Sequence, residues 1–128
     1  MLRLMRDEDI PDLRRLWEKV FGDGDEYLDL FFRDLYQTGS GVVINENDDL
    51  AAMGFLINIG SYNDSDCLVT YAVACDPNYR GRGFGGEISR KLYDMSGEGG
   101  VICPAEPSLF DFYRDRTEYK TEFYVTGL

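Results

Sequence analysis

The feature that most constrains the fold is a glycine-rich segment that separates an apolar run from an amphipathic pattern. Residues 81–86 contain four glycines, and they follow residues 67–75, which are β-branched and apolar on both faces. A pattern with helical spacing covers residues 84–95, and a short apolar run follows at 101–103. The order strand, turn, helix, strand is typical of a parallel crossover, which is right-handed in nearly all cases. The 67–75 run therefore predicts a central strand buried on both faces.

Other patterns predict the remaining elements. The expected helices lie at 10–21, 25–36 and from Ser108 onward, and the expected strands at 2–5, 42–44, 50–59 and 118–125, with a polar turn at 60–66. The resulting order is β-α-α-β-β-β-α-β-α-β, which indicates an α/β fold with a mixed sheet. With 128 residues, the chain has the length of one domain, so we expect residues 1–128 to form a single domain.

The charge balance disfavours several classes of function. The chain has 13 basic and 24 acidic side chains, a net charge of −11. Such a surface repels phosphodiester backbones and anionic membranes, so we expect no nucleic-acid or membrane partner. Residues 1–70 hold 6 of the basic and 15 of the acidic side chains, a net charge of −9. An anion site is therefore expected in the second half, whereas the first half would attract a cationic partner.

Residues that the chain lacks narrow the chemistry further. It has no histidine, which excludes His-based triads, Cys–His nucleophiles and His-ligated metals. The longest apolar run, 51–59, is too short to span a bilayer, and the N-terminal residues lack the apolar core of a signal peptide. Cys67, Cys75 and Cys103 follow no metal-ligand spacing, so we expect reduced thiols in a cytoplasmic protein and no metal site.

The glycine-rich segment has the composition of a phosphate-binding loop. Glycines let the backbone approach a ligand, the following helix presents unpaired N–H groups, and two arginines add positive charge. Gly81, Gly83 and Gly86 also match the dinucleotide pattern G-x-G-x-x-G, but that loop should follow its strand at once, and here residues 76–80 intervene. Residues 82–85 match the start of an RNA-binding pattern, which the next two residues and the acidic charge contradict.

A third interpretation fits the whole segment from Val73 to Gly86. It resembles the acetyl-CoA-binding motif of the GNAT N-acetyltransferases, whose core Arg-x-x-Gly-x-Gly is matched at Arg80, Gly83 and Gly85. The preceding strand that ends in Asp-Pro, the following helix and a downstream Phe-Tyr pair at 112–113 strengthen the resemblance, which covers nearly the whole chain. Residues 104–113 are similar to the Eis-type acetyltransferases within this family.

The resemblance implies the GNAT acyl-CoA N-acyltransferase fold and acetyl-CoA as cosubstrate. It implies that the pantetheine arm pairs with the strand at 73–75, where that strand splays from 101–103, and that the Val73 amide polarises the thioester carbonyl. It further implies that loop amides hold the pyrophosphate and that Tyr113 protonates the departing thiolate. The cofactor-binding residues are then Val73, Ala74, Cys75, Arg80, Gly81, Arg82, Gly83, Phe84, Gly85 and Gly86.

The expected function is therefore transfer of acetyl from acetyl-CoA to a primary amine, which attacks directly in a ternary complex. A cationic acceptor such as a polyamine, an aminoglycoside or a lysine-bearing peptide fits the acidic first half, and the family also allows a homodimer. Glu106, Asp76 and Asp66 are candidates for the general base, and none is assigned. The alternative is a non-catalytic acyl-CoA-binding or regulatory domain, because the glycine that usually follows the tyrosine is missing and the chain ends soon after the last strand.

Overall fold

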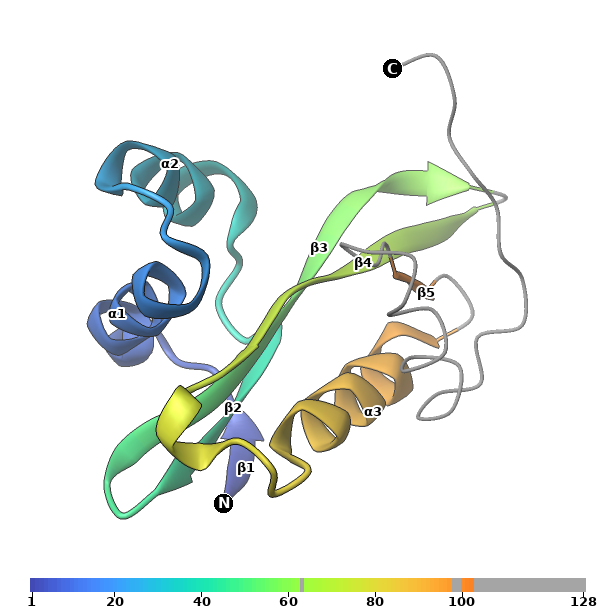
Figure 1. Ribbon diagram of the computed structural model, residues 1–128. Coiled ribbons are helices and arrows are strands. Elements are labelled where there is room, and N and C mark those ends of the chain that lie inside the picture. Colours follow the sequence, from blue (N-terminus) through green and yellow to red (C-terminus); the bar gives the residue numbers. More distant parts are fainter. Residues whose placement is uncertain (63, 98–99, 103–128) are drawn as a thin grey trace.

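The computed structural model describes residues 1–62, 64–97 and 100–102 and shows a mixed sheet with helices on both faces (Figure 1). The strands follow the order β1-β2-β3-β4-β5 across the sheet. Their bounds are β1 Leu2–Leu4, β2 Gly41–Glu46, β3 Asp49–Tyr62, β4 Ser65–Cys75 and β5 Gly100–Ile102, and the helices are α1 Ile10–Phe21, α2 Asp25–Leu30 and α3 Phe84–Ser96. Neighbouring strands are antiparallel except β4 and β5, which are parallel. The predicted α/β class and the parallel connection through α3 are confirmed.

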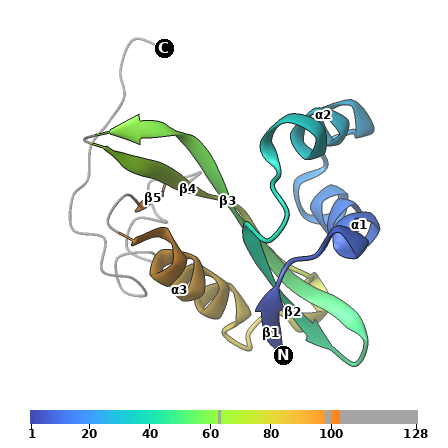
Figure 2. The same cartoon turned by 180° about the vertical axis from the view of Figure 1, so that it is seen from behind.

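The helices divide the core into two layers. Figure 2 shows α1 and α2 on one face of the sheet and α3 on the other. The first layer is dominated by aromatic rings around Trp17, including Phe31 at 4.6 Å and Phe55 at 5.6 Å between ring centroids. The second packs Ile88 and Leu92 of α3 on the opposite face. Burying such side chains is the main favourable contribution to folding, about 1.5–3 kcal/mol for each.

Helix α1 begins and ends where the local sequence predicts. Pro11 occupies its first turn, where the missing N–H costs nothing. Gly22 ends it in the left-handed conformation with φ of 73°. Asp23 and Gly24 then form the link to α2. The expected helix at 25–36 is present, but its last part, Phe31–Leu35, widens into a π-helix in which the Tyr36 amide donates to the Phe31 carbonyl.

The two hairpins differ in how well the sequence predicted them. The β2–β3 connection is the two-residue turn Asn47-Asp48, where both residues have positive φ as a tight hairpin requires. The prediction of a polar turn at 60–66 is wrong, because the turn is much shorter. Strand β3 continues to Tyr62 and β4 starts at Ser65, because paired backbone groups tolerate polar side chains on exposed strands.

Strand β4 contains a bulge that no sequence pattern indicated. Met53 pairs with Ala74 whereas Phe55 pairs with Tyr71, so Gly54 alone faces two residues of β4. One of these, Ala72, has φ of +52°. The strand is also the fourth of the described five and is mostly half-buried, which corrects the prediction of a central strand buried on both faces. Among the described strands only β5 lies beyond β4, and it pairs with just three residues, Leu68–Thr70, so β4 lies near the edge of the described sheet rather than at its centre.

Candidate functional site

Among the described residues, the second half of β4 has an uncovered edge beside β5. Strand β5 pairs with Leu68, Val69 and Thr70. Within the described ranges, no strand continues along residues 71–75 on that side, although β3 pairs with the other side. Main-chain groups along an uncovered edge can pair with an extended ligand as another strand would. Val73, Ala74 and Cys75, the residues expected to hold the pantetheine arm, lie on this stretch.

The loop after β4 is anchored by Asp76. Its carboxylate accepts hydrogen bonds from the Asn78 amide at 2.8 Å and from Lys19 Nζ of α1 at 3.0 Å. Its own amide donates to the Ala51 carbonyl at 2.8 Å. The Asn78 amide, and then Lys19, hold the pKa of Asp76 below its ordinary value. Asp76 is therefore committed to shaping the loop, and a carboxylate with a lowered pKa is a weak general base.

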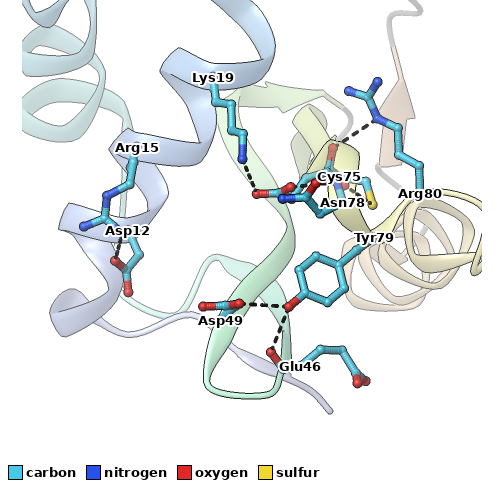
Figure 3. Close-up of polar contacts among 10 residues, drawn as sticks. Asp12, Arg15, Lys19, Glu46, Asp49, Cys75, Asn78, Tyr79 and Arg80 are labelled. Carbon is cyan, nitrogen blue, oxygen red and sulfur yellow. Dashed lines mark hydrogen bonds and ion pairs between the residues drawn. The ribbon is translucent and has the colours of Figure 1, made fainter.

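Tyr79 positions one of the two arginines of the loop. The Tyr79 hydroxyl donates to Asp49 Oδ2 at 2.9 Å, and the Arg82 guanidinium lies over the Tyr79 ring at 5.2 Å (Figure 3 shows the Tyr79 contact). Arg80 Nε donates to the Cys75 carbonyl at 3.3 Å. Neither arginine forms an ion pair with any carboxylate of the described residues. Both guanidinium groups can therefore still bind an anion.

The loop ends at the N-terminus of α3. Gly81 and Gly83 have φ of 84° and 80°, a conformation that favours glycine, and Gly83 is the residue that caps α3. The first amides of the helix have no intrahelical acceptor and carry the positive end of the helix dipole. Free amides, two arginines and a backbone without side chains together form a surface suited to a phosphate or diphosphate.

The thiol at the end of β4 is less reactive at neutral pH than an exposed cysteine would be. Burial, above all other causes, raises the pKa of Cys75, so the protonated thiol predominates. Cys67 and Cys75 are both free cysteines. Cys103 lies outside the described residues.

The structure thus brings together at one end of the sheet all ten residues predicted to bind the cofactor. It does not test their roles. Tyr113, Glu106 and the segment 104–113 that suggested an Eis-type domain lie outside the described residues, so those assignments stay predictions. Asp66, the third candidate base, is exposed near the β3–β4 turn.

Two residues that support the loop were missed by sequence analysis. Lys19 and Asp49 hold Asp76 and Tyr79 from elements 57 and 30 residues away in the chain. Both line an open cleft of about 310 Å³ between α1, the β2–β3 turn and the loop. No local pattern distinguishes them from other charged surface residues, because the contacts form only when α1 and the turn pack beside the loop.

Comparisons with known proteins agree with this geometry. Residues 1–119 match the family model described as an acetyltransferase (GNAT) domain, so the chain belongs to the GNAT acetyltransferase family. No curated protein matches the sequence at a significant level. No helix among the described residues is long and apolar enough to cross a membrane.

Solved structures of acetyltransferases share the fold. An acetyltransferase of Trypanosoma brucei superposes with a TM-score of 0.74 at 14% identity, covering 100% of this chain and 97% of that chain. Glucosamine-6-phosphate N-acetyltransferase of Arabidopsis thaliana superposes with a TM-score of 0.71 at 19% identity, covering 100% of this chain and 96% of that chain. An aminoglycoside acetyltransferase from an uncultured soil metagenomic sample superposes with a TM-score of 0.66 at 19% identity, covering 100% of this chain and 96% of that chain. At these identities the similarity shows the fold alone.

Proposed function

We propose that this protein transfers the acetyl group of acetyl-CoA to a primary amine that attacks directly in a ternary complex. The observation that carries the proposal is the continuity of one surface. The uncovered edge of β4 at 71–75 leads through Arg80 and Arg82 to the free amides at the start of α3. An extended pantetheine arm and a diphosphate need these two surfaces in this order. Free Cys67 and Cys75 would remain reduced in the cytoplasm, where we place the protein.

The proposed reaction needs few groups from the protein. The amine nitrogen attacks the thioester carbonyl carbon, the new C–N bond forms, and the C–S bond breaks to release the thiolate of CoA. In our proposal the Val73 amide donates to the carbonyl oxygen as negative charge develops there, an interaction worth roughly 10²–10³ in rate. Tyr113 gives its proton to the departing thiolate, and the proton lost by the amine passes to a carboxylate or to water.

Binding is the first test, because it does not depend on the acceptor. Coenzyme A, NAD and ATP are compared by thermal unfolding. At a concentration 100 times its Kd, the true ligand adds about 2.7 kcal/mol to the free energy of unfolding. Replacing Arg82 by Gln should weaken coenzyme A binding about tenfold, because it removes a charged donor to phosphate. Arg90→Gln, on the exposed side of α3, is the matched control and should bind coenzyme A with the affinity of wild type. Failure of coenzyme A to stabilise the protein would contradict the proposal.

Turnover is the second test. Acetyl-CoA is incubated with a panel of primary amines, and release of free CoA thiol is followed. We expect acceptor-dependent release with at least one amine. Tight binding of coenzyme A without transfer to any acceptor would contradict the enzymatic proposal and would favour the alternative, a non-catalytic acyl-CoA-binding domain.

A further inference from the structure

One half-buried carboxylate on the face covered by α1 and α2 lacks a cationic partner among the described residues. Among the described residues, four acidic residues are partly or fully buried, namely Asp9, Asp23, Glu46 and Asp76. Three of these pair with a cation: Asp9 with Arg3, Glu46 with the N-terminal amine, and Asp76 with Lys19. Asp23 has no such partner within the same ranges. A carboxylate that loses solvent without gaining a counterion is costly unless something else compensates it.

The Asp23 carboxylate is held in place rather than free to turn. It lies in the short link between α1 and α2, and the Trp17 indole N–H donates to its Oδ2 at 2.9 Å. The Trp17 ring is buried at the centre of the aromatic layer, with 1% of its surface exposed. The other oxygen, Oδ1, receives no hydrogen bond from any described residue. The carboxylate is therefore oriented and still able to accept.

Two tyrosines pack against the same Trp17 ring that donates to Asp23. The hydroxyls of Tyr27 on α2 and Tyr71 on β4 are hydrogen-bonded to each other. The Tyr71 ring stacks on Phe31 and contacts Trp17 with centroid separations of 5.8 and 5.9 Å, which holds it in position. Burial, then the bond to Tyr27, and then the charge of Asp23 raise the pKa of Tyr71. The Tyr71 hydroxyl thus stays protonated and neutral, and the negative charge of Asp23 contributes to this.

This cluster adjoins the surface assigned to the thioester. Tyr71 is the first residue of the uncovered stretch of β4 and lies two residues before Val73, whose amide we assign to the thioester carbonyl. Tyr71 belongs to the layer under α1 and α2, whereas Val73 packs against α3. An acceptor that approaches from the α1–α2 side would therefore pass Asp23 and the two hydroxyls.

We propose that Asp23, together with the Tyr27 and Tyr71 hydroxyls, binds a positively charged group of the acceptor that is not the reacting amine. The acceptor is then an aliphatic primary amine that carries a second cationic centre. This inference rests on the proposed function, because it assumes that the acetyl group lies near Val73. It also agrees with the net charge of −9 on residues 1–70, which attracts polycations to this half of the molecule.

The chemistry of the attack explains why the bound cation should not be the nucleophile. An alkylamine with a pKa near that of lysine is neutral in about one molecule in 2,500 at pH 7. A carboxylate beside the ammonium would favour the charged form and would lower that fraction about tenfold for each unit of pKa. A carboxylate that binds a second, distant cation positions the acceptor without this penalty on its reactivity.

The turnover experiment compares cadaverine with pentylamine, which has the same chain and lacks the second amine. We expect wild type to show a kcat/KM about tenfold or more higher for cadaverine. Asp23→Asn keeps an oxygen for the Trp17 indole and removes the charge, so the ratio of the two kcat/KM values should fall toward one. Asp25→Asn, which changes an exposed carboxylate paired with Arg14, is the control and should keep the ratio. An unchanged ratio in Asp23→Asn would overturn the inference.

The binding experiment separates this inference from the proposed function. Trp17 is the only tryptophan of the chain and donates to Asp23, so its fluorescence reports on this carboxylate without any turnover. Cadaverine should change the emission with a Kd that rises about tenfold or more in Asp23→Asn and not in Asp25→Asn. If this holds while no amine is acetylated, the cation site stands and the enzymatic proposal fails. Equal Kd values in wild type and Asp23→Asn would show that the cation site is wrong, whatever the turnover.

Discussion

Three aspartates illustrate how environment assigns different roles to one side chain. The Asp9 carboxylate accepts two bonds from Arg3 and one from the Arg6 amide, all at 2.8 Å, and lies buried. Asp76 shapes the loop after β4. Asp23 is oriented by an indole and has no cation among the described residues. All three are at least partly buried, so the presence or absence of a counterion is what separates a structural carboxylate from a candidate binding group.

The Asp9–Arg3 pair predicts a pH dependence of stability. The hydrogen bond from Arg3, more than any other cause, holds the pKa of Asp9 below its ordinary value. A lowered folded-state pKa stabilises the protein above the unfolded-state value, about pH 4, and this contribution is lost as the pH falls through the lower folded-state value. At neutral pH the free energy of unfolding of Asp9→Asn should therefore be about 1–3 kcal/mol lower than that of wild type. On acidification the free energy of unfolding should fall less in Asp9→Asn than in wild type.

Urea unfolding near neutral pH and below about pH 4 measures this effect. Asp12→Asn is the control, because Asp12 and Arg15 form a pair on the exposed side of α1 with side-chain exposures of 50% and 74%. Such pairs contribute less than about 1 kcal/mol. Equal losses in the two variants at neutral pH would contradict the role assigned to Asp9.

A substitution at Tyr113 tests the proposed acid. Tyr113→Phe removes only the hydroxyl, so kcat for the best acceptor amine should fall about 10²–10⁴-fold while the Kd for coenzyme A stays constant. Steady-state kinetics and calorimetry measure the two quantities. Tyr36→Phe, which loses a hydroxyl bonded to Asp7 away from the loop, should retain wild-type kcat. A Tyr113→Phe enzyme with unchanged kcat would remove this residue from the mechanism.

At the scale of elements, the bulge in β4 decides which faces meet at the candidate site. Side chains two residues apart in a regular strand share a face. Here Tyr71 packs in the layer under α1 and α2, whereas Val73 packs against α3, because the extra residue at Ala72 shifts the alternation. One strand thus places a hydroxyl of the proposed acceptor site and a residue of the proposed cofactor edge close together in sequence but on opposite faces.

Helix α3 packs closely against Gly54, which lies opposite the bulge. A Cβ there would lie 2.8 Å from Leu92 Cδ1 and would also overlap Ile88 of α3. Gly54→Ala should therefore cost about 1–3 kcal/mol through overpacking. Gly24→Ala is the matched control, because a Cβ at Gly24 has no atom within 4 Å and its φ of −80° suits any residue. Thermal and urea unfolding compare them, and equal stability of the two variants would contradict the packing described for α3.

At the scale of the whole molecule, the excess of 11 negative charges predicts a dependence on salt. Repulsion among like charges destabilises the compact state, and salt screens it over a distance that falls to about 10 Å at 0.1 M. The midpoint of thermal unfolding should rise as NaCl is added to a low-salt buffer. The affinity for cadaverine should fall over the same range, because salt screens attraction as well. A midpoint that stays constant or falls would mean that the charges are already compensated in the fold.

The fold class was predictable because its signals are local and periodic. Helix α1 follows from Pro11, the apolar stripe and Gly22. The prediction of a phosphate-binding loop, which stays a prediction, follows from glycines and arginines within a few residues of each other. The single-domain assignment for residues 1–128, a homodimer and the identity of the acceptor remain predictions. The boundaries of the β3–β4 hairpin were predicted wrongly, because in exposed strands backbone pairing outweighs the polar character of the side chains.

What the sequence determined by itself was the family and the mixed sheet, and it also predicted anion binding at residues 80–86, since each depends on neighbours along the chain. Only the tertiary structure decided the rest. Lys19 reaches Asp76 from α1, Tyr27 reaches Tyr71 across 44 residues, and Asp23 is left without a cation among the described residues. These relations depend on how α1 and α2 pack on the sheet, and packing between distant segments leaves no periodic trace in a single sequence.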